Sequence, residues 1–190
     1  MYYVYNANLI DLYADNTVDF VANQCNCFGH MGKGIALEIK QRIPEAYGAD
    51  VNFPIEKGEA RLGKFSWYDD GLHGGVVNLY GQLHWNKKGQ NTDSWALDNA
   101  MTEFFDMLRH NHPFFTKQTS RGKYNVGFPR LIGCGLGGGE WSVVHKMLEA
   151  KGFEYQDIAN IWIVSLDKSP YEQIESMTPP VERKKAWELN

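Results

Sequence analysis

A glycine-rich turn between a strand and a helix, at residues 23–37, constrains the fold most strongly. The apolar run at residues 18–22 predicts a buried strand, and residues 35–41 predict a helix. Between them stands Gly32-Lys33-Gly34, whose glycines leave the backbone bare beside the positive end of that helix. Free backbone N–H groups at a helix N-terminus bind anions such as phosphate. The stretch therefore predicts an anion site at the carboxyl end of a buried strand.

A second turn of the same kind lies at residues 133–139, which read Gly-Cys-Gly-Leu-Gly-Gly-Gly. It follows a strand predicted at residues 124–128 and precedes an amphipathic helix predicted at residues 141–151. Open α/β sheets bind ligands where such loops meet at the ends of strands. The amides of two loops suit a pyrophosphate better than a single phosphate. Tight turns without a ligand remain an alternative, because glycine is also common in sharp turns.

Strand and helix patterns alternate along the chain and predict a three-layer α/β/α fold around a mixed sheet. The length of 190 residues suits one domain over residues 1–168, followed by a polar C-terminal extension at residues 169–190. Further strands are expected at residues 2–5, 63–68, 75–80 and 161–164. The clearest helix is expected at residues 94–108, and a short helix should begin at Pro44. Residues 9–12 should form a short extended or one-turn piece.

Charge and composition exclude several classes of protein. A net charge of −4 provides no global basic field for nucleic acid. No apolar run approaches the roughly 20 residues that span a bilayer, and the N-terminus lacks the features of a signal peptide. Three cysteines argue against a disulfide framework and suit a reducing compartment. We therefore expect a cytoplasmic protein with no membrane partner.

Two other phosphate motifs fit the glycine turns less well. Gly29 stands too close to Gly32-Lys33 for a Walker loop. The spacing Gly133-x-Gly135-x-x-Gly138 matches the dinucleotide fingerprint, but it lies late in the chain and the usual acidic partner would be distant. A nicotinamide dehydrogenase therefore stays open as an alternative.

The cysteines do not predict a metal or a nucleophile. Cys25, Cys27 and His30 lack the spacing of a common structural zinc site and have no fourth ligand, so we expect no metal. Small buried cysteines explain the first two better. No acid–base partner can be placed beside Cys134, which we interpret as a packing residue within the second turn.

Both turns and their neighbours resemble the macrodomain family of ADP-ribose-binding proteins. The similar residues are the pattern Asn23-x-x-Asn26-x-x-Gly29-x-Met31-Gly32-Lys33-Gly34-Ile35-Ala36, the Pro44-Glu45 that follows, and the late run from Pro129 to Trp141. Within the family, the pattern resembles the branch of terminal ADP-ribose glycohydrolases and of antitoxins that remove ADP-ribose from DNA. The resemblance runs from about Val4 to Leu166 and implies a mixed sheet with ADP-ribose across its strand ends.

The resemblance also implies ligand-binding roles. Asn8 stands where the family's Asp or Asn meets the adenine, and Asn26 matches the asparagine at the distal ribose. The first loop at the pyrophosphate and distal ribose is matched by Gly32, Lys33, Gly34 and Ile35, and the second phosphate loop by Gly133, Cys134, Gly135, Leu136 and Gly137. No separate cofactor is implied.

Two departures from that branch bear on catalysis. Gln82 stands where some relatives carry a lysine that attacks the anomeric carbon, and glutamine cannot form that adduct. Gly137 stands where some carry an aspartate. Near the distal ribose we expect Asn26, His30 and Glu140 as candidate catalytic residues and Gln82 as a ligand contact. His30 comes first, because an exposed loop histidine titrates near neutral pH.

Three functions follow as hypotheses. The leading one is an enzyme, an ADP-ribosyl hydrolase or ADP-ribose 1″-phosphate phosphatase, that hydrolyses an ADP-ribose derivative at the distal ribose. The second is a non-catalytic module that binds ADP-ribose or a related nucleotide, which both departures favour. The third is a regulator whose basic loops, at residues 87–88 and 117–123, contact nucleic acid. The expected partner is ADP-ribose or an ADP-ribosylated substrate, with nucleic acid only as a modified substrate.

Overall fold

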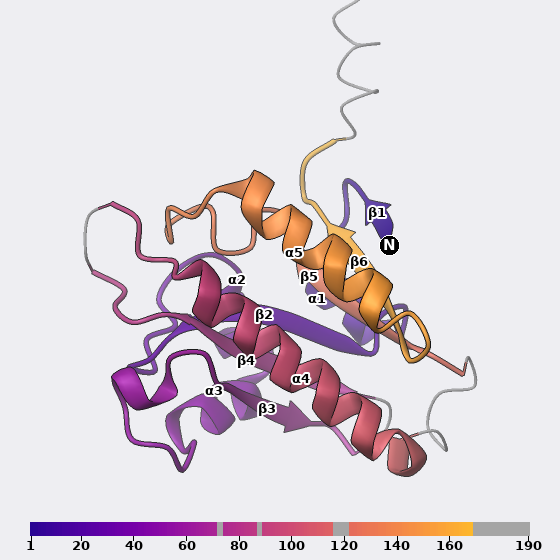
Figure 1. The fold of residues 1–190 in the computed structure, drawn as a ribbon, viewed down its shortest axis with the longest axis horizontal. Coiled ribbons are helices and arrows are strands. Elements are labelled where there is room, and N and C mark those ends of the chain that lie inside the picture. Colours follow the sequence, from indigo (N-terminus) through magenta and orange to yellow (C-terminus); the bar gives the residue numbers. More distant parts are fainter. Residues whose placement is uncertain (72–73, 87–88, 116–121, 169–190) are drawn as a thin grey trace, which may run out of the picture.

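A computed structural model of the chain describes residues 1–71, 74–86, 89–115 and 122–168. In this part a sheet lies between two layers of helices (Figure 1), which confirms the predicted three-layer α/β/α fold. The predicted extension at residues 169–190 and the basic positions 87–88, 117 and 121 lie outside the described residues. Among the described helices, none is long and apolar enough to cross a membrane.

The sheet is mixed, as predicted. Its described strands stand in the order β1-β6-β5-β2-β4-β3, and all neighbours run parallel except β3 and β4. The strands are β1 (Tyr2–Val4), β2 (Phe20–Asn26), β3 (Phe65–Asp69), β4 (Gly75–Gln82), β5 (Tyr124–Pro129) and β6 (Ala159–Val164).

Helices cover both faces of the sheet (Figure 1). One face packs against α1 (Leu9–Ala14), α2 (Gly34–Arg42) and α3 (Pro44–Val51), and the other against α4 (Ser94–Phe115) and α5 (Trp141–Glu154). A short 3₁₀ turn spans Glu59–Arg61. The predicted apolar face of α4 is confirmed, since it is fully buried at Leu97, Met101, Phe104, Phe105 and Leu108.

The centre of the sheet opens towards the carboxyl ends of β2 and β5. These two strands pair only at Phe20–Val126 and Val21–Gly127, whereas β2 stays paired with β4 up to Asn26. The first glycine loop follows β2 and the second follows β5. Both loops therefore meet at the same edge of the sheet, at the point where parallel α/β sheets bind ligands.

Candidate functional site

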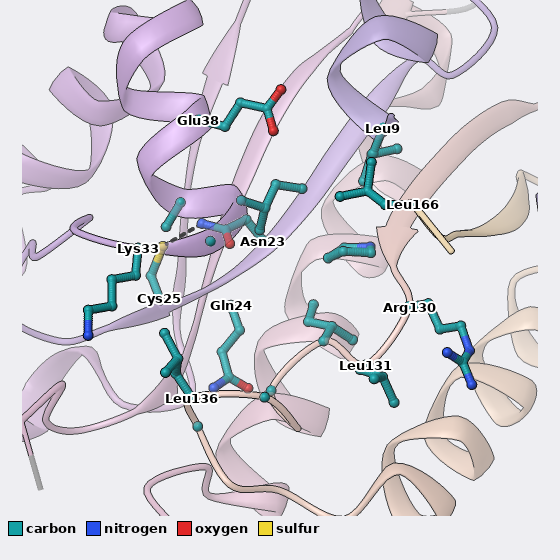
Figure 2. Close-up of a pocket in the computed structure, with 18 of the residues that line it drawn as sticks. Leu9, Asn23, Gln24, Cys25, Lys33, Glu38, Arg130, Leu131, Leu136 and Leu166 are labelled. Carbon is teal, nitrogen blue, oxygen red and sulfur yellow. Dashed lines mark hydrogen bonds between the residues drawn. The ribbon is translucent and has the colours of Figure 1, made fainter. Parts of the chain in front are cut away.

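A cavity of about 1080 Å³ lies between the two loops and the ends of β2 and β5 (Figure 2). This is the size expected for a small-molecule or cofactor site. The structure brings together most of the predicted site residues along its walls: Asn8, Asn26, His30, Gly32, Lys33, Gly34, Ile35, Gln82, Gly133, Gly135, Leu136 and Gly137.

The first loop leads directly into α2, whose N-terminus opens into the cavity. Lys33 is the N-cap residue and makes no side-chain capping bond, while Gly34, Ile35 and Ala36 line the cavity. Gly34 has a φ of +57°, and a Cβ added there would meet nothing within 4 Å. The first turn of α2 therefore borders the cavity, and an anion site formed by its N–H groups and the helix dipole stays a prediction.

Asn26 shapes the first loop from within. Its side-chain Nδ2 donates to the His30 carbonyl at 2.7 Å, and its Oδ1 accepts from the N–H groups of Phe28 at 3.1 Å and His30 at 3.2 Å. The side chain is nearly fully buried although it borders the cavity. Its polar atoms are therefore engaged in holding the turn, and the contact with a distal ribose stays a prediction.

The His30 side chain is exposed at the cavity rim. Its ring stacks on Trp85, with centroids 4.8 Å apart and planes 22° apart. A Cβ at Gly32 would lie 2.8 Å from His30 Nε2, so the glycine makes room for this ring. The loop therefore presents the His30 imidazole at the cavity rim, and its role in acid–base catalysis stays a prediction.

A chain of neutral polar groups supports the second loop. Gln24 Nε2 donates to Gln82 Oε1 at 2.9 Å and to Thr92 Oγ1 at 2.8 Å. Thr92 Oγ1 in turn donates to the Gly133 carbonyl at 2.6 Å. Figure 2 shows Gln24 extending from β2 towards this loop. These bonds join β2, β4 and the second loop. The bonded residues lie far apart in the chain, so no local sequence pattern indicates them.

Close packing leaves little room for side chains in the second loop, most severely at two of its glycines. A Cβ at Gly133 would lie 2.4 Å from Gln24 Oε1, and one at Gly137 would lie 2.4 Å from Thr92 Oγ1. These distances are far shorter than real Cβ contacts. The absence of an aspartate at Gly137 therefore has a physical reason, because Thr92 occupies the space.

Gln82 takes part in the same support. Its Nε2 donates to the His84 carbonyl at 2.8 Å, while its Oε1 accepts from Gln24. The amide borders the cavity at the end of β4 but is bonded on both sides. It holds the loop after β4 rather than offering a nucleophile.

Two predicted site residues do not line the cavity. Cys134 is half-buried against the hydrophobic core, and burial raises the pKa of its thiol. Glu140 is exposed at the start of α5, where its carboxylate accepts a hydrogen bond from the Ser142 hydroxyl. The structure thus separates Glu140 from His30 and the rest of the site, because the second loop carries the chain away from the cavity before α5 begins.

Asn8 borders the opposite end of the cavity, but its side chain is occupied. Its Oδ1 caps α1 by accepting from the N–H of Ile10 at 2.8 Å and of Asp11 at 3.3 Å, and its Nδ2 donates to Glu38 Oε1 at 2.8 Å. The expected adenine contact stays a prediction. The cap explains why residues 9–14 form a helix rather than the shorter piece that was expected.

Sequence reasoning missed several residues of the cavity wall. Glu38 comes from α2, and Arg130 and Leu131 follow β5 (Figure 2). Asp167, which follows β6, also lines the cavity. Arg130 Nη1 lies 3.6 Å from Asp167 Oδ2, so the charges of these two cavity residues offset each other. Leu131 has a φ of +66°, an uncommon conformation for leucine that marks the sharp exit from β5. Trp85 also lines the cavity. The pair His84-Trp85 in the loop after β4 was the one feature of the sequence that could have indicated it.

The cysteines after the centre of β2 are buried. Cys25 and Cys27 belong to a small apolar cluster, and burial raises the pKa of both thiols, that of Cys27 to about 12. Both thiols therefore stay protonated near neutral pH. Within the part of the chain that the structure describes, no group of three or more His, Cys, Asp or Glu residues is arranged to hold a metal ion.

Known proteins are similar to this chain in sequence and in fold. No family model matches the chain. An uncharacterised 17.5 kDa protein of Enterobacteria phage T4 is 28% identical over 146 residues, which cover 75% of this chain and 85% of the phage protein. A protein of Mycobacterium tuberculosis named DNA ADP-ribosyl glycohydrolase is 28% identical over 141 residues, 73% of this chain. The matched region is only 36% of that mycobacterial protein.

Solved structures decide the fold family. The macrodomain of M. tuberculosis DarG superposes with a TM-score of 0.60 at 25% identity, covering 84% of this chain and 96% of that macrodomain. The chain has the macrodomain fold. A macrodomain fold is also shared with Thermosipho africanus DarTG, solved in complex with ADP-ribose, at a TM-score of 0.60 and 20% identity over 83% of this chain and 41% of that one. The predicted resemblance to the macrodomain family, and within it to proteins that remove ADP-ribose from DNA, is therefore confirmed.

Proposed function

We propose that this chain binds ADP-ribose and hydrolyses an ADP-ribose derivative at the distal ribose. One observation carries the proposal: the uncapped N-terminus of α2 and the second glycine loop face each other across one cavity. Backbone amides from both sides suit the two phosphates of a pyrophosphate. The structural likeness to a DarTG protein solved with ADP-ribose, and the name of the mycobacterial relative, support this ligand and this reaction.

Hydrolysis here uses water rather than a lysine adduct. A water oxygen bonds to the anomeric carbon of the distal ribose while the bond to the leaving group breaks, and the leaving group keeps the electron pair. His30 at the cavity rim accepts the proton from the water and passes one to the leaving group. Gln82 has no nucleophilic atom, and its amide is already hydrogen-bonded at both ends.

A non-catalytic ADP-ribose-binding module is the second candidate. The observation in its favour is that Asn26 and Gln82 use their polar atoms to support the loops. Such a module keeps the cavity and the anion site but performs no chemistry.

Calorimetry with ADP-ribose tests the binding proposal. We expect saturable binding by the wild type and its loss in Gly34→Glu, because the new carboxylate stands beside the pyrophosphate. Gly71→Glu is a matched control: Gly71 also has a positive φ and open space around a Cβ, but it does not line the cavity. Gly34→Ala adds the same backbone strain without the charge. Absence of binding by the wild type, or equal binding by Gly34→Glu and Gly71→Glu, would contradict the proposal.

Turnover separates the enzyme from the binding module. The purified protein is offered ADP-ribose 1″-phosphate, an ADP-ribosylated oligonucleotide and an ADP-ribosylated protein, and released ADP-ribose is measured. We expect release from at least one substrate and a fall of about 10²-fold or more in His30→Ala. Binding without release would favour the module, and full activity of His30→Ala would remove the role given to this residue.

We also propose that the protein acts in the cytoplasm. Its cysteines, Cys25, Cys27 and Cys134, are free thiols. A reducing compartment keeps such thiols from oxidation. Fractionation of cells that produce the protein tests the location, and recovery outside the cytoplasm would contradict it.

A further inference from the structure

Three buried polar side chains lie together on one face of the central strands. Asn23 and Cys25 stand two residues apart on β2, so they point to the same face of the sheet. Asn78 is paired in register with Asn23 on the neighbouring strand β4. Asn23 and Cys25 line the cavity, whereas Asn78 is fully buried and does not. The two strands therefore place a polar cluster in the wall of the cavity and directly behind it.

A hydrogen bond to the backbone fixes the orientation of the Asn78 amide. Its Nδ2 donates to the Ala46 carbonyl of α3 and to Ser66 Oγ, at 3.2 Å each. A backbone carbonyl only accepts, so the nitrogen of this amide must face α3, and Asn78 Oδ1 faces Cys25. Cys25 Sγ donates to that oxygen at 3.6 Å. Burial raises the pKa of the Cys25 thiol, which therefore keeps the hydrogen that it donates.

The direction of these bonds decides which end of the Asn23 amide meets the cavity. Because the hydrogen of Cys25 is used on Asn78, its sulfur accepts from Asn23 Nδ2, at 3.1 Å (Figure 2). Within the described part of the chain, Asn23 Oδ1 accepts no hydrogen bond, and it is not one of the fully buried polar atoms that lack a partner. This oxygen therefore keeps access to the cavity that Asn23 lines.

We propose that Asn23 Oδ1 accepts a hydrogen bond from the ligand, and that Asn78 is the positioning residue that keeps this oxygen turned to the cavity. The inference rests on the proposed function, which makes ADP-ribose the ligand. Its ribose hydroxyls and its adenine amino group are donors, whereas its ionised phosphates offer only acceptors. A site built around an acceptor rejects a ligand that lacks the matching donor, because the acceptor is then left unpaired.

Calorimetry tests this with ADP-ribose, with analogues that each lack one ribose hydroxyl, and with the analogue that carries hypoxanthine in place of adenine. We expect at least one analogue to bind the wild type about 5- to 10-fold more weakly than ADP-ribose does. For that analogue the loss should shrink to less than about 2-fold in Asn78→Leu, because the Asn23 amide is no longer held in one orientation. The analogue that behaves in this way identifies the ligand group as a hydroxyl or as the amino group.

Two further comparisons separate positioning from a general loss of stability. Cys25→Ser keeps a donor and an acceptor between Asn23 and Asn78 and should keep the loss seen in the wild type, whereas Cys25→Ala should not. Ser66→Ala is the matched control. It also removes a buried hydrogen bond of Asn78, but the Ala46 carbonyl still orients the amide, so the discrimination between ligands should stay that of the wild type.

The inference is wrong if no analogue binds the wild type more weakly than ADP-ribose, or if Asn78→Leu keeps the full loss. It is also wrong if Ser66→Ala reduces the loss as far as Asn78→Leu does, or if Cys25→Ser and Cys25→Ala behave alike. A cooperative urea transition verifies that each variant is folded, and the Cys25 pair carries the test if Asn78→Leu does not fold. Failure of the proposed function looks different, because then the wild type does not bind ADP-ribose itself.

Discussion

The two glycine loops reach the same cavity but are held in different ways. The second loop is fixed by packing, since Cβ atoms at Gly133 and Gly137 would collide with Gln24 and Thr92. The first loop is held by hydrogen bonds from Asn26, and a Cβ at Gly34 would point into open space. The second loop is therefore tightly packed against β2 and Thr92, whereas the first loop is an exposed turn whose shape is set by hydrogen bonds.

The supports beneath the loops also differ in charge. Beneath the first loop, buried Arg61 donates to the carbonyls of Asp50, Phe53 and Ile55 at 2.9 Å each, and its Nη1 lies 3.6 Å from Asp50 Oδ1. A Cβ on Gly29 would be 3.8 Å from Asp50 Oδ2, so this ion pair reaches the loop. Beneath the second loop, Gln24 and Thr92 are neutral. We therefore expect the stability around the first loop to depend on charge and pH, and the stability around the second loop to depend on the size of the side chains packed there.

The largest effect is expected where the charged support is removed. Arg61→Ala removes the cation paired with the buried Asp50 carboxylate and strips three carbonyls of their donor, which should cost about 3–5 kcal/mol in the free energy of unfolding. Urea denaturation measures it. The control is Arg42→Ala, whose exposed guanidinium bonds only the carboxylates of Asp11 and Glu38 in the described part of the chain, and which should cost less than about 1 kcal/mol. Equal losses for the two variants would mean that the buried pair does not support the fold.

The next effect tests the packing of the second loop. Gly137→Ala places a methyl 2.4 Å from Thr92 Oγ1 and should destabilise the protein by about 1–3 kcal/mol. Gly135→Ala is the matched change, because nothing lies within 4 Å of a Cβ there and its backbone needs no positive φ; it should stay within about 0.5 kcal/mol of the wild type. Both values come from urea denaturation. If the two variants were equally stable, the second loop would be as adaptable as the first.

The local sequence pattern predicted the strands, the helices and the meeting of the two loops, but not the side-chain hydrogen bonds that hold the loops in place. The apolar face of α4 and the runs that became β2, β4 and β5 are periodic, and the carboxyl ends of parallel strands must share one edge, so the loops and their meeting point were predictable. The bond from Gln24 to Thr92 joins residues 68 apart, and nothing in either neighbourhood marks it. The same holds for the separation of Glu140 from the cavity, which depends on the path of the second loop.

A moderate effect should follow from loosening the first loop. Asn26→Ala removes the donor to the His30 carbonyl and the acceptor for two N–H groups, and should cost about 1–2 kcal/mol in the free energy of unfolding. ADP-ribose affinity, measured by calorimetry, should fall as well, because the loop is no longer preorganised. Asn26→Asp keeps the acceptor and loses the donor, so it should lie between alanine and the wild type. Unchanged affinity in Asn26→Ala would show that the turn holds its shape without this side chain.

The smallest effect concerns pH and the acid beneath the first loop. Burial raises the pKa of Asp50 above its usual value of 3.8, although the Tyr80 hydroxyl, Arg61 and Lys57 act in the opposite direction. The folded state therefore binds this proton more tightly than the unfolded state does. The resulting stabilisation is full below the ordinary pKa and is lost as pH rises through the higher, folded-state pKa.

Asp50→Asn removes this titration while keeping an acceptor for the Tyr80 hydroxyl, which bonds Asp50 Oδ1 at 2.8 Å. Urea denaturation between about pH 3.5 and pH 7 should show the stability of the wild type falling relative to Asp50→Asn as pH rises, and then a constant difference. The cost of Gly137→Ala should not vary over this range, since Gln24 and Thr92 carry no titratable group. A pH-independent difference between wild type and Asp50→Asn would mean that the acid beneath the first loop does not titrate differently on folding, and the contrast in charge between the two loops would be lost.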